Sequence, residues 1–175
     1  MVKKYSNLEL LNLIFKSKQF LGIPFGIHGR AHACRVFAFA NILSNLVKDR
    51  KKIDIQTIII SSLLHDCGRS NDGKDIFHGV KSSEKVIDFI KYYKVFCNIK
   101  LVIECITRHC PPPGYKNNNP SIESQIIGDS DKLDRFRFHK QKNPCKEYLL
   151  DLEESKFLMD ISSRINGHAW RYFKK

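Results

Sequence analysis

The sequence predicts an all-α protein, and three observations support this prediction. Apolar residues recur at the three- and four-residue spacing of amphipathic helices along most of the chain. Almost no segment shows the alternation of apolar and polar residues that marks a strand. Glycine and proline clusters separate the helical segments from one another. We therefore expect a compact bundle of several helices that forms one domain over residues 1–175.

The first half of the chain is expected to form three helices. A capping box that begins at Ser6 opens a helix to about residue 20, and residues 22–29 form a loop. Residues 30–48 are apolar nearly all round, which is typical of a central buried helix. Asp54 is a suitable N-cap for the third helix, and Gly68 marks its end.

The second half is expected to form four more helices. Residues 79–94 carry apolar side chains on one face, and the helix over 99–108 is stopped by the proline-rich segment 111–114. A helix that begins at position 121 should run to about position 136. The last helix, over about 146–173, is amphipathic and should pack on the rest of the domain.

Composition argues against several classes of protein. A chain of 175 residues can bury a sizeable core without disulfides. The longest apolar run is too short to cross a membrane, and the N-terminus lacks the apolar stretch of a signal peptide, so we expect a cytoplasmic protein without a membrane partner. The net charge of +12 suits an anionic partner. Nucleic acid is permitted but not favoured, because no aromatic and basic ribbon or helix-turn-helix signature is visible.

The six cysteines show no C-x-x-C spacing, so neither a zinc knuckle nor a redox pair is expected. Three of them, Cys34, Cys67 and Cys110, lie next to candidate ligands in the sequence. We interpret them as small packing residues with free thiols. A thiolate ligand is the alternative.

An adjacent histidine and aspartate, His65 and Asp66, close the apolar run of the third expected helix. Two polar side chains at the buried end of a helix are costly unless something satisfies them, and a metal ion does so well. Neighbouring helical residues point about 100° apart, so both side chains can reach one ion only at a helix end. Gly68 supplies that end. A surface pair without function is the alternative for the dipeptide alone.

Other histidines and aspartates stand near the ends of other expected helices. His32 lies in the first turn of the helix over 30–48, and Asp129 lies in the helix that begins at position 121. His78 and His109 fall between the His-Asp pair and Asp129. The joint order of histidines and aspartates is much more specific than any one of its parts.

With these motifs the chain resembles the HD-domain metal-dependent phosphohydrolases. The similar strings are HGRAHACRV over 28–36, LHDCGR over 64–69, HGVKS over 78–82 and DSDKLDR over 129–135. The resemblance covers about residues 24–137 and implies an all-helical HD domain. It further implies that one divalent metal ion is held by His32, His65, Asp66 and Asp129.

The resemblance also bears on a second ion. Family members with additional histidines in these places can hold two metals, so His78 and His109 are the second pair of candidate ligands; His78 can instead contact phosphate. If two ions bind, Asp66 is the expected bridge, because a carboxylate has two oxygens. Imidazole and carboxylate ligands suit Mn²⁺, Fe²⁺, Co²⁺, Ni²⁺, Zn²⁺ and also Mg²⁺. Such ions activate water near neutral pH, which makes His65 and Asp66 the candidate catalytic residues.

Several basic side chains near these ligands fit a phosphate substrate. The candidates for substrate binding are His28, Arg35, Arg69, Lys132 and Arg135. Arg35 follows His32 by three residues, so both can face one cavity, whereas Arg135 lies nearer to the opposite side of its helix from Asp129. Salt bridges that hold Asp131 or Asp134 are the alternative role for these cations. His28 has a further alternative, a hydrogen bond to a metal ligand.

The sequence therefore predicts a metal-dependent phosphohydrolase with one or two divalent ions per chain. A metal-activated water would cleave a phosphate ester or anhydride bond, and the expected substrate is a nucleotide or a related small phosphorylated metabolite. The missing motifs of the cyclic-dinucleotide branch argue against that substrate class. The alternative function is a catalytically silent module that binds a nucleotide or RNA. The complete set of ligands argues against it, because a pure binder needs no water-activating centre.

Overall fold

The computed structural model describes residues 2–48, 50–138 and 145–172. In these ranges the chain forms seven α-helices, three short 3-10 helices and no strand, which confirms the all-α prediction. The α-helices are α1 (Asn7–Lys16), α2 (Arg30–Leu46), α3 (Ile55–Leu64), α4 (His78–Tyr93), α5 (Ile99–His109), α6 (Ile122–Leu133) and α7 (Glu153–Tyr172). The 3-10 helices are η1 (Arg50–Lys52), η2 (Asp134–Arg137) and η3 (Glu147–Leu149). None of the described helices is both long and apolar enough to cross a membrane.

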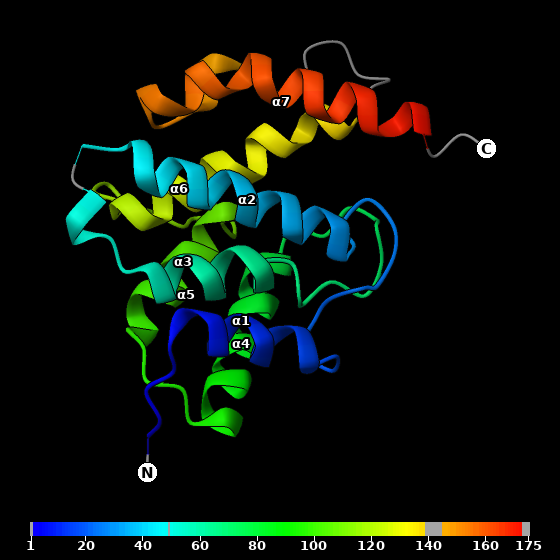
Figure 1. Ribbon diagram of the computed structural model, residues 1–175. Coiled ribbons are helices and arrows are strands. Elements are labelled where there is room, and N and C mark those ends of the chain that lie inside the picture. Colours follow the sequence, from blue (N-terminus) through cyan, green and yellow to red (C-terminus); the bar gives the residue numbers. More distant parts are fainter. Residues whose placement is uncertain (1, 49, 139–144, 173–175) are drawn as a thin grey trace.

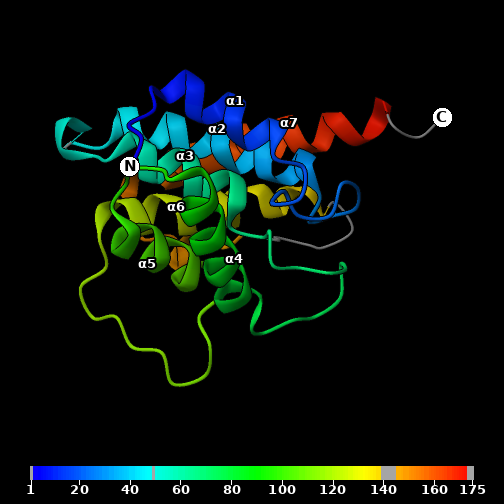
Figure 2. The ribbon, with the colours of Figure 1, turned by 90° about the horizontal axis from the view of Figure 1, so that it is seen from below.

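The helices form a layered bundle with α3 near its centre. Figure 1 shows α7 lying across one end, α6 and α2 below it, and α1 and α4 at the other end. Figure 2 shows α1, α4 and α5 from that other end. One apolar cluster joins α1, α3, α4 and α5, and a second joins α2, α3, α6 and α7. Helix α3 belongs to both clusters, because its side chains are buried nearly all round.

Side-chain caps fix where several helices begin. Ser6 and Glu9 form the predicted capping box of α1, and Asp54 accepts hydrogen bonds from the backbone of the first turn of α3. Asn98 and Ser121 cap α5 and α6 in the same way. Each cap satisfies backbone N–H groups that have no partner within the helix.

Two predicted helix boundaries were wrong. Helix α1 ends at Lys16 instead of near residue 20, because Ser17 leaves the helical conformation and its hydroxyl donates to the carbonyl of Leu13. The last helix begins at Glu153 instead of near residue 146, because residues 147–149 form η3 and the backbone after it is extended. The final residue of that predicted helix, at position 173, lies outside the described residues.

Two glycines allow helix α4 to approach its neighbours closely. A Cβ atom at Gly68 would lie 2.4 Å from the backbone nitrogen of Ser82, and one at Gly79 would lie 2.6 Å from the carbonyl oxygen of Cys110. Both distances are too short for any real side chain, and both neighbours are backbone atoms. The glycines therefore set how closely α4 packs against the turn after α3 and the end of α5.

We predict that Gly79→Ala lowers the free energy of unfolding by about 1–3 kcal/mol, because the new methyl group forces α4 and α5 apart. Urea unfolding followed by circular dichroism measures this. The control is Gly73→Ala, whose Cβ would meet only the end of the Asn71 side chain, and its effect should stay within about 0.5 kcal/mol. Equal effects of the two substitutions would contradict the packing role of Gly79.

Candidate metal centre

Four buried histidines meet at the centre of the bundle, and each is fixed by a hydrogen bond from Nδ1. His65 follows α3, and its Nδ1 donates to the carbonyl oxygen of Ser62 at 2.9 Å. His32 lies in the first turn of α2, and its Nδ1 donates to Oδ2 of Asp134 at 2.7 Å. These partners fix the orientation of each ring and place the proton on Nδ1.

The other two histidines lie at the beginning of α4 and the end of α5. His78 donates through Nδ1 to the carbonyl oxygen of Asp75, and His109 donates through Nδ1 to the carbonyl oxygen of Ile106. A neutral imidazole with its proton on Nδ1 carries a lone pair on Nε2. All four rings therefore present Nε2 as an acceptor or as a metal ligand.

The Nε2 atoms face one another in two pairs. His32 Nε2 lies 3.0 Å from His65 Nε2, and His78 Nε2 lies 3.0 Å from His109 Nε2. Two lone pairs at this distance repel each other unless a proton or a cation lies between or beside them. Each pair is therefore arranged as two ligands of one cation would be.

Asp66 lies between the two pairs and turns one oxygen to each. Its Oδ2 is 3.6 Å from Nε2 of His32 and 3.6 Å from Nε2 of His65. Its Oδ1 is 3.3 Å from Nε2 of His78 and 3.5 Å from Nε2 of His109. The bridging position that the sequence predicts for Asp66 is thus available to it.

A second carboxylate, Asp131 of α6, completes the group around the first pair. Its Oδ1 lies 3.3 Å from His32 Nε2 and 4.0 Å from His65 Nε2. His32, His65 and Asp131 place one ligand atom each within 4.8 Å of one another, and so do His65, Asp66 and His109. Either group can hold a metal ion.

The expectation for Asp129 was wrong. Its carboxylate faces away from the histidines and accepts hydrogen bonds from the backbone N–H of Asp151 at 3.0 Å and of Leu152 at 2.9 Å. Lys132 donates to it as well, at 3.1 Å. Residues two apart on a helix point about 200° apart, so Asp129 and Asp131 serve opposite sides of α6. Asp129 anchors the segment that leads into α7. Asp131 lies beside His32 and His65, where Asp129 was expected.

The pKa values of the two carboxylates are lowered, and burial also lowers the pKa values of His65 and His78. Burial raises the pKa of Asp66, but the nearby imidazoles of His65, His109 and His28 outweigh it and hold the pKa well below its usual range. For Asp131, burial is likewise outweighed, mainly by the hydrogen bond with His32. Burial lowers the pKa of His65 to about 4. Anionic oxygens beside neutral imidazole nitrogens are a donor set for a divalent cation.

The pKa of His32 is shifted in the opposite direction from that of His65. Burial lowers its pKa, but hydrogen bonds with Asp131 and Asp134 outweigh that effect and raise it above the usual value. The space between His32 and Asp131 therefore favours a positive charge, which either a proton or a metal cation can supply.

A cavity of about 360 Å³ opens onto this centre. Its lining includes the proposed ligands Asp66, His78, His109 and Asp131, and the remaining lining residues are His28, Arg69, Cys110, Arg135, Arg137 and Phe138. We call this the main cavity. Arg137 and Phe138 follow the last motif, and no local signal in the sequence marks them as cavity residues.

Three of the five predicted substrate-binding residues line the main cavity. Arg69 is held there, because its Nε donates to Asp66 Oδ1 at 2.9 Å and its Nη2 donates to His78 Nε2 at 3.1 Å. Arg135 also lines the cavity, and its guanidinium forms no hydrogen bond or ion pair with the residues that the structure describes. His28 is the third, and its Nδ1 lies 2.9 Å from Asp66 Oδ2.

The other two predicted binders lie outside the main cavity. Arg35 donates to both carboxylate oxygens of Asp134, at 2.7 and 3.1 Å. Lys132 donates to Asp129 and to the carbonyl oxygen of Leu149. Arg35 thus follows the salt-bridge alternative with Asp134, whereas Lys132 pairs with Asp129 and Asp151, which that alternative did not name.

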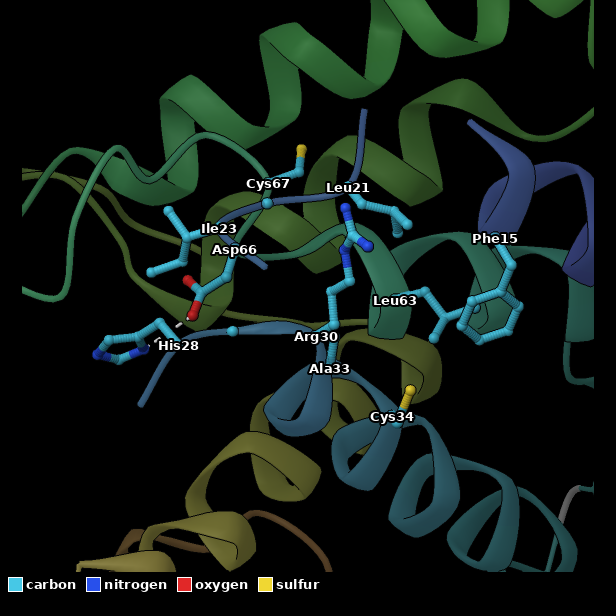
Figure 3. A pocket seen from close by; sticks show the side chains of 12 residues that line it. Phe15, Leu21, Ile23, His28, Arg30, Ala33, Cys34, Leu63, Asp66 and Cys67 are labelled. Carbon is cyan, nitrogen blue, oxygen red and sulfur yellow. Dashed lines mark hydrogen bonds and ion pairs between the residues drawn. The ribbon is translucent and has the colours of Figure 1, made fainter. Parts of the chain in front are cut away.

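A neighbouring loop holds His28 at the edge of the centre. The Asp72 carboxylate accepts hydrogen bonds from the backbone N–H of Ile27 at 3.1 Å and of His28 at 3.0 Å. Figure 3 shows the His28 ring beside the Asp66 carboxylate, with the Cys67 thiol directed to the other side.

Burial raises the pKa of the Cys67 thiol to about 12, and its Sγ donates to the carbonyl oxygen of Ser82. Burial also raises the pKa values of the Cys34 and Cys110 thiols, so all three thiols stay protonated, as packing residues do.

A model of the HD domain family matches residues 30–135, which is more than half of the chain. This chain belongs to the HD-domain family. The family is a superfamily of metal-dependent hydrolases that bind divalent metals, and the match confirms the resemblance seen in the sequence. Searches of curated proteins and of solved structures gave no significant match to this HD-domain protein.

We predict that Asp131→Asn and Asp129→Asn separate metal binding from stability. Asp131→Asn should lose bound divalent metal, because the removed charge faces His32 and His65. Asp129→Asn should keep the metal and lower the free energy of unfolding by about 1–3 kcal/mol, because it weakens a buried acceptor of backbone N–H groups. Elemental analysis and urea unfolding measure the two effects, and the reverse assignment would contradict the placement of α6.

Proposed function

We propose that this HD-domain protein is a metal-dependent phosphohydrolase. The observation that carries the proposal is the arrangement of two pairs of Nε2 lone pairs, each pair 3.0 Å apart, with the Asp66 carboxylate between them. The proposed substrate is a nucleotide or a related small phosphorylated metabolite, cleaved by water at a phosphate ester or anhydride bond.

The first cation would be held by His32, His65, Asp66 and Asp131. This group is the better prepared of the two, because the carboxylates of Asp66 and Asp131 both lie beside its imidazole nitrogens. Buried anionic carboxylates without a cation would be costly. A divalent ion is therefore the natural partner of this group.

The second cation would be held by Asp66, His78 and His109. Here Arg69 donates to Asp66 Oδ1 and His78 Nε2, which are two of the three ligand atoms. A second ion must displace these contacts, after which the Arg69 guanidinium is free to bind a phosphate oxygen. The first site should consequently fill before the second.

The residues of the main cavity support phosphoryl chemistry in three ways. Divalent cations, when bound, make water a nucleophile near neutral pH and withdraw charge from a phosphoryl oxygen. The hydrogen bonds from Nδ1 fix the histidine rings before the substrate arrives, so little reorganisation is needed. Arg135 is positioned on the cavity wall to pair with a phosphate, since no described carboxylate engages its guanidinium.

Hydrolysis should depend on a divalent metal. We predict that the wild-type protein binds two metal equivalents at saturation, that His78→Ala binds one and that His65→Ala binds essentially none at the first site. Turnover of a panel of nucleotides, a generic phosphomonoester and a generic phosphodiester with Mn²⁺, Mg²⁺, Co²⁺ and Ni²⁺ measures the activity. Metal binding without turnover of any substrate would reject the hydrolase and favour the catalytically silent binding module.

Arg135→Ala should raise KM by about tenfold, because one charge-assisted contact to phosphate is lost. The metal content should stay unchanged, since Arg135 does not touch the proposed ligands' Nε2 atoms. Arg50→Ala is the matched control, because Arg50 is an exposed arginine in η1, beyond the opposite end of α2 from His32. An unchanged KM in Arg135→Ala would exclude this residue from phosphate binding.

A further inference from the structure

A second cavity adjoins the main cavity at His109. It measures about 340 Å³, and its lining includes Arg108, His109, Tyr115, Gly128 and Lys132. We call it the side cavity. On α6, Gly128 and Lys132 are one turn apart and line the side cavity, while Asp131 lines the main cavity together with Arg135 of η2. The two cavities thus lie on neighbouring faces of the same helix.

The charges in the side cavity are balanced. Arg108 donates to Asp151 Oδ2 at 2.9 Å. Lys132 donates to Asp129 at 3.1 Å and to Asp151 at 3.4 Å. Two cations therefore face two carboxylates, and a further anion would meet no surplus positive charge. The side cavity suits an uncharged group with hydrogen-bonding edges better than a phosphate.

Gly128 has no packing role that would explain a glycine there. A Cβ atom at this position would lie 3.5 Å from Arg108 Nη1 and 3.9 Å from Lys132 Nζ, which are ordinary contact distances. Glycine is nevertheless the poorest helix former except proline, and alanine would be the better residue within α6. The missing methyl group leaves space in the wall of the side cavity.

The side cavity is also lined by Tyr115, which lies on the loop between α5 and α6. The Tyr115 hydroxyl has no hydrogen-bond partner in the part of the chain that the structure describes. Farther along the loop, Glu104 accepts hydrogen bonds from Asn117 Nδ2 at 3.1 Å and from the backbone of Ser121 at 2.8 Å. An aromatic side chain in a cavity wall is a surface on which a planar ring can stack.

We propose that the side cavity, lined by Tyr115 and Gly128, binds the uncharged planar part of the substrate, a nucleobase, while the phosphate lies in the main cavity. The position of the phosphate in this arrangement rests on the proposed function. The base site itself rests on the balanced charge, the space at Gly128 and the aromatic side chain.

Nucleoside binding tests the side cavity without any turnover. Adenosine, guanosine, cytidine and uridine are titrated into the full-length protein, and affinity is measured by calorimetry. We expect at least one nucleoside to bind the wild-type protein, and Tyr115→Ala to raise its Kd by about tenfold through lost stacking. Gly128→Ala should raise the Kd by about fivefold while the midpoint of thermal unfolding does not fall, since alanine favours the helix. Tyr92→Ala is the control, because Tyr92 is an exposed tyrosine near the end of α4 and does not line the side cavity. This substitution should leave the Kd unchanged.

A parallel measurement compares nucleoside monophosphates with ribose 5-phosphate, which lacks a base. Both substitutions should lower kcat/KM for the nucleotide and leave kcat/KM for ribose 5-phosphate within about twofold of the wild type. Absent nucleoside binding, or equal losses on both substrates, would overturn the base site and leave the hydrolase standing. Nucleoside binding that weakens in both variants, in a protein that hydrolyses nothing, would support the base site and overturn the hydrolase.

Discussion

The four imidazole rings at the centre of the molecule cannot satisfy one another. Each has already used its Nδ1 proton on a carbonyl or a carboxylate, so only lone pairs remain where His32 meets His65 and where His78 meets His109. His32 and His65 are almost completely buried, and an unpaired buried acceptor is costly. Whatever positive charge resolves this conflict also joins α2, α3, α4 and α5 at one point. The centre is therefore coupled to the stability of the bundle as well as to its chemistry.

Helix ends explain how such a centre can be built in an all-α protein. The last carbonyl groups of a helix have no partner within it, and His65 and His109 satisfy two of them, those of Ser62 and Ile106. The same hydrogen bonds that complete α3 and α5 thus turn the Nε2 atoms inward. Each of these two histidines bonds to a carbonyl only three residues earlier in the chain. The orientation of the two rings is therefore set by local structure.

Residues on different sides of helix α6 face three different parts of the molecule. Asp129 bonds to the backbone that precedes α7, Asp131 faces the histidines, and Gly128 and Lys132 face the side cavity. Because Asp129 and Asp131 point to opposite sides of α6, the anchoring of Asp129 also fixes the position of Asp131. Asp129 therefore contributes to the centre indirectly, by setting the rotation of the helix that carries its neighbour.

The sequence by itself determined the helical class, the family and the set of histidines that meet at the centre, because periodicity, caps and short motifs are local properties of the chain. It could not choose between Asp129 and Asp131, which stand two residues apart in one polar stretch. That choice depends on which distant segment packs against each side of α6. It could not place Arg35 or Lys132 either, because Asp134 holds Arg35 and the carbonyl oxygen of Leu149 holds Lys132, and only the fold brings these acceptors close. Only tertiary packing decided these positions. Each depends on contacts between segments that are distant in the sequence, and local sequence patterns do not indicate such contacts.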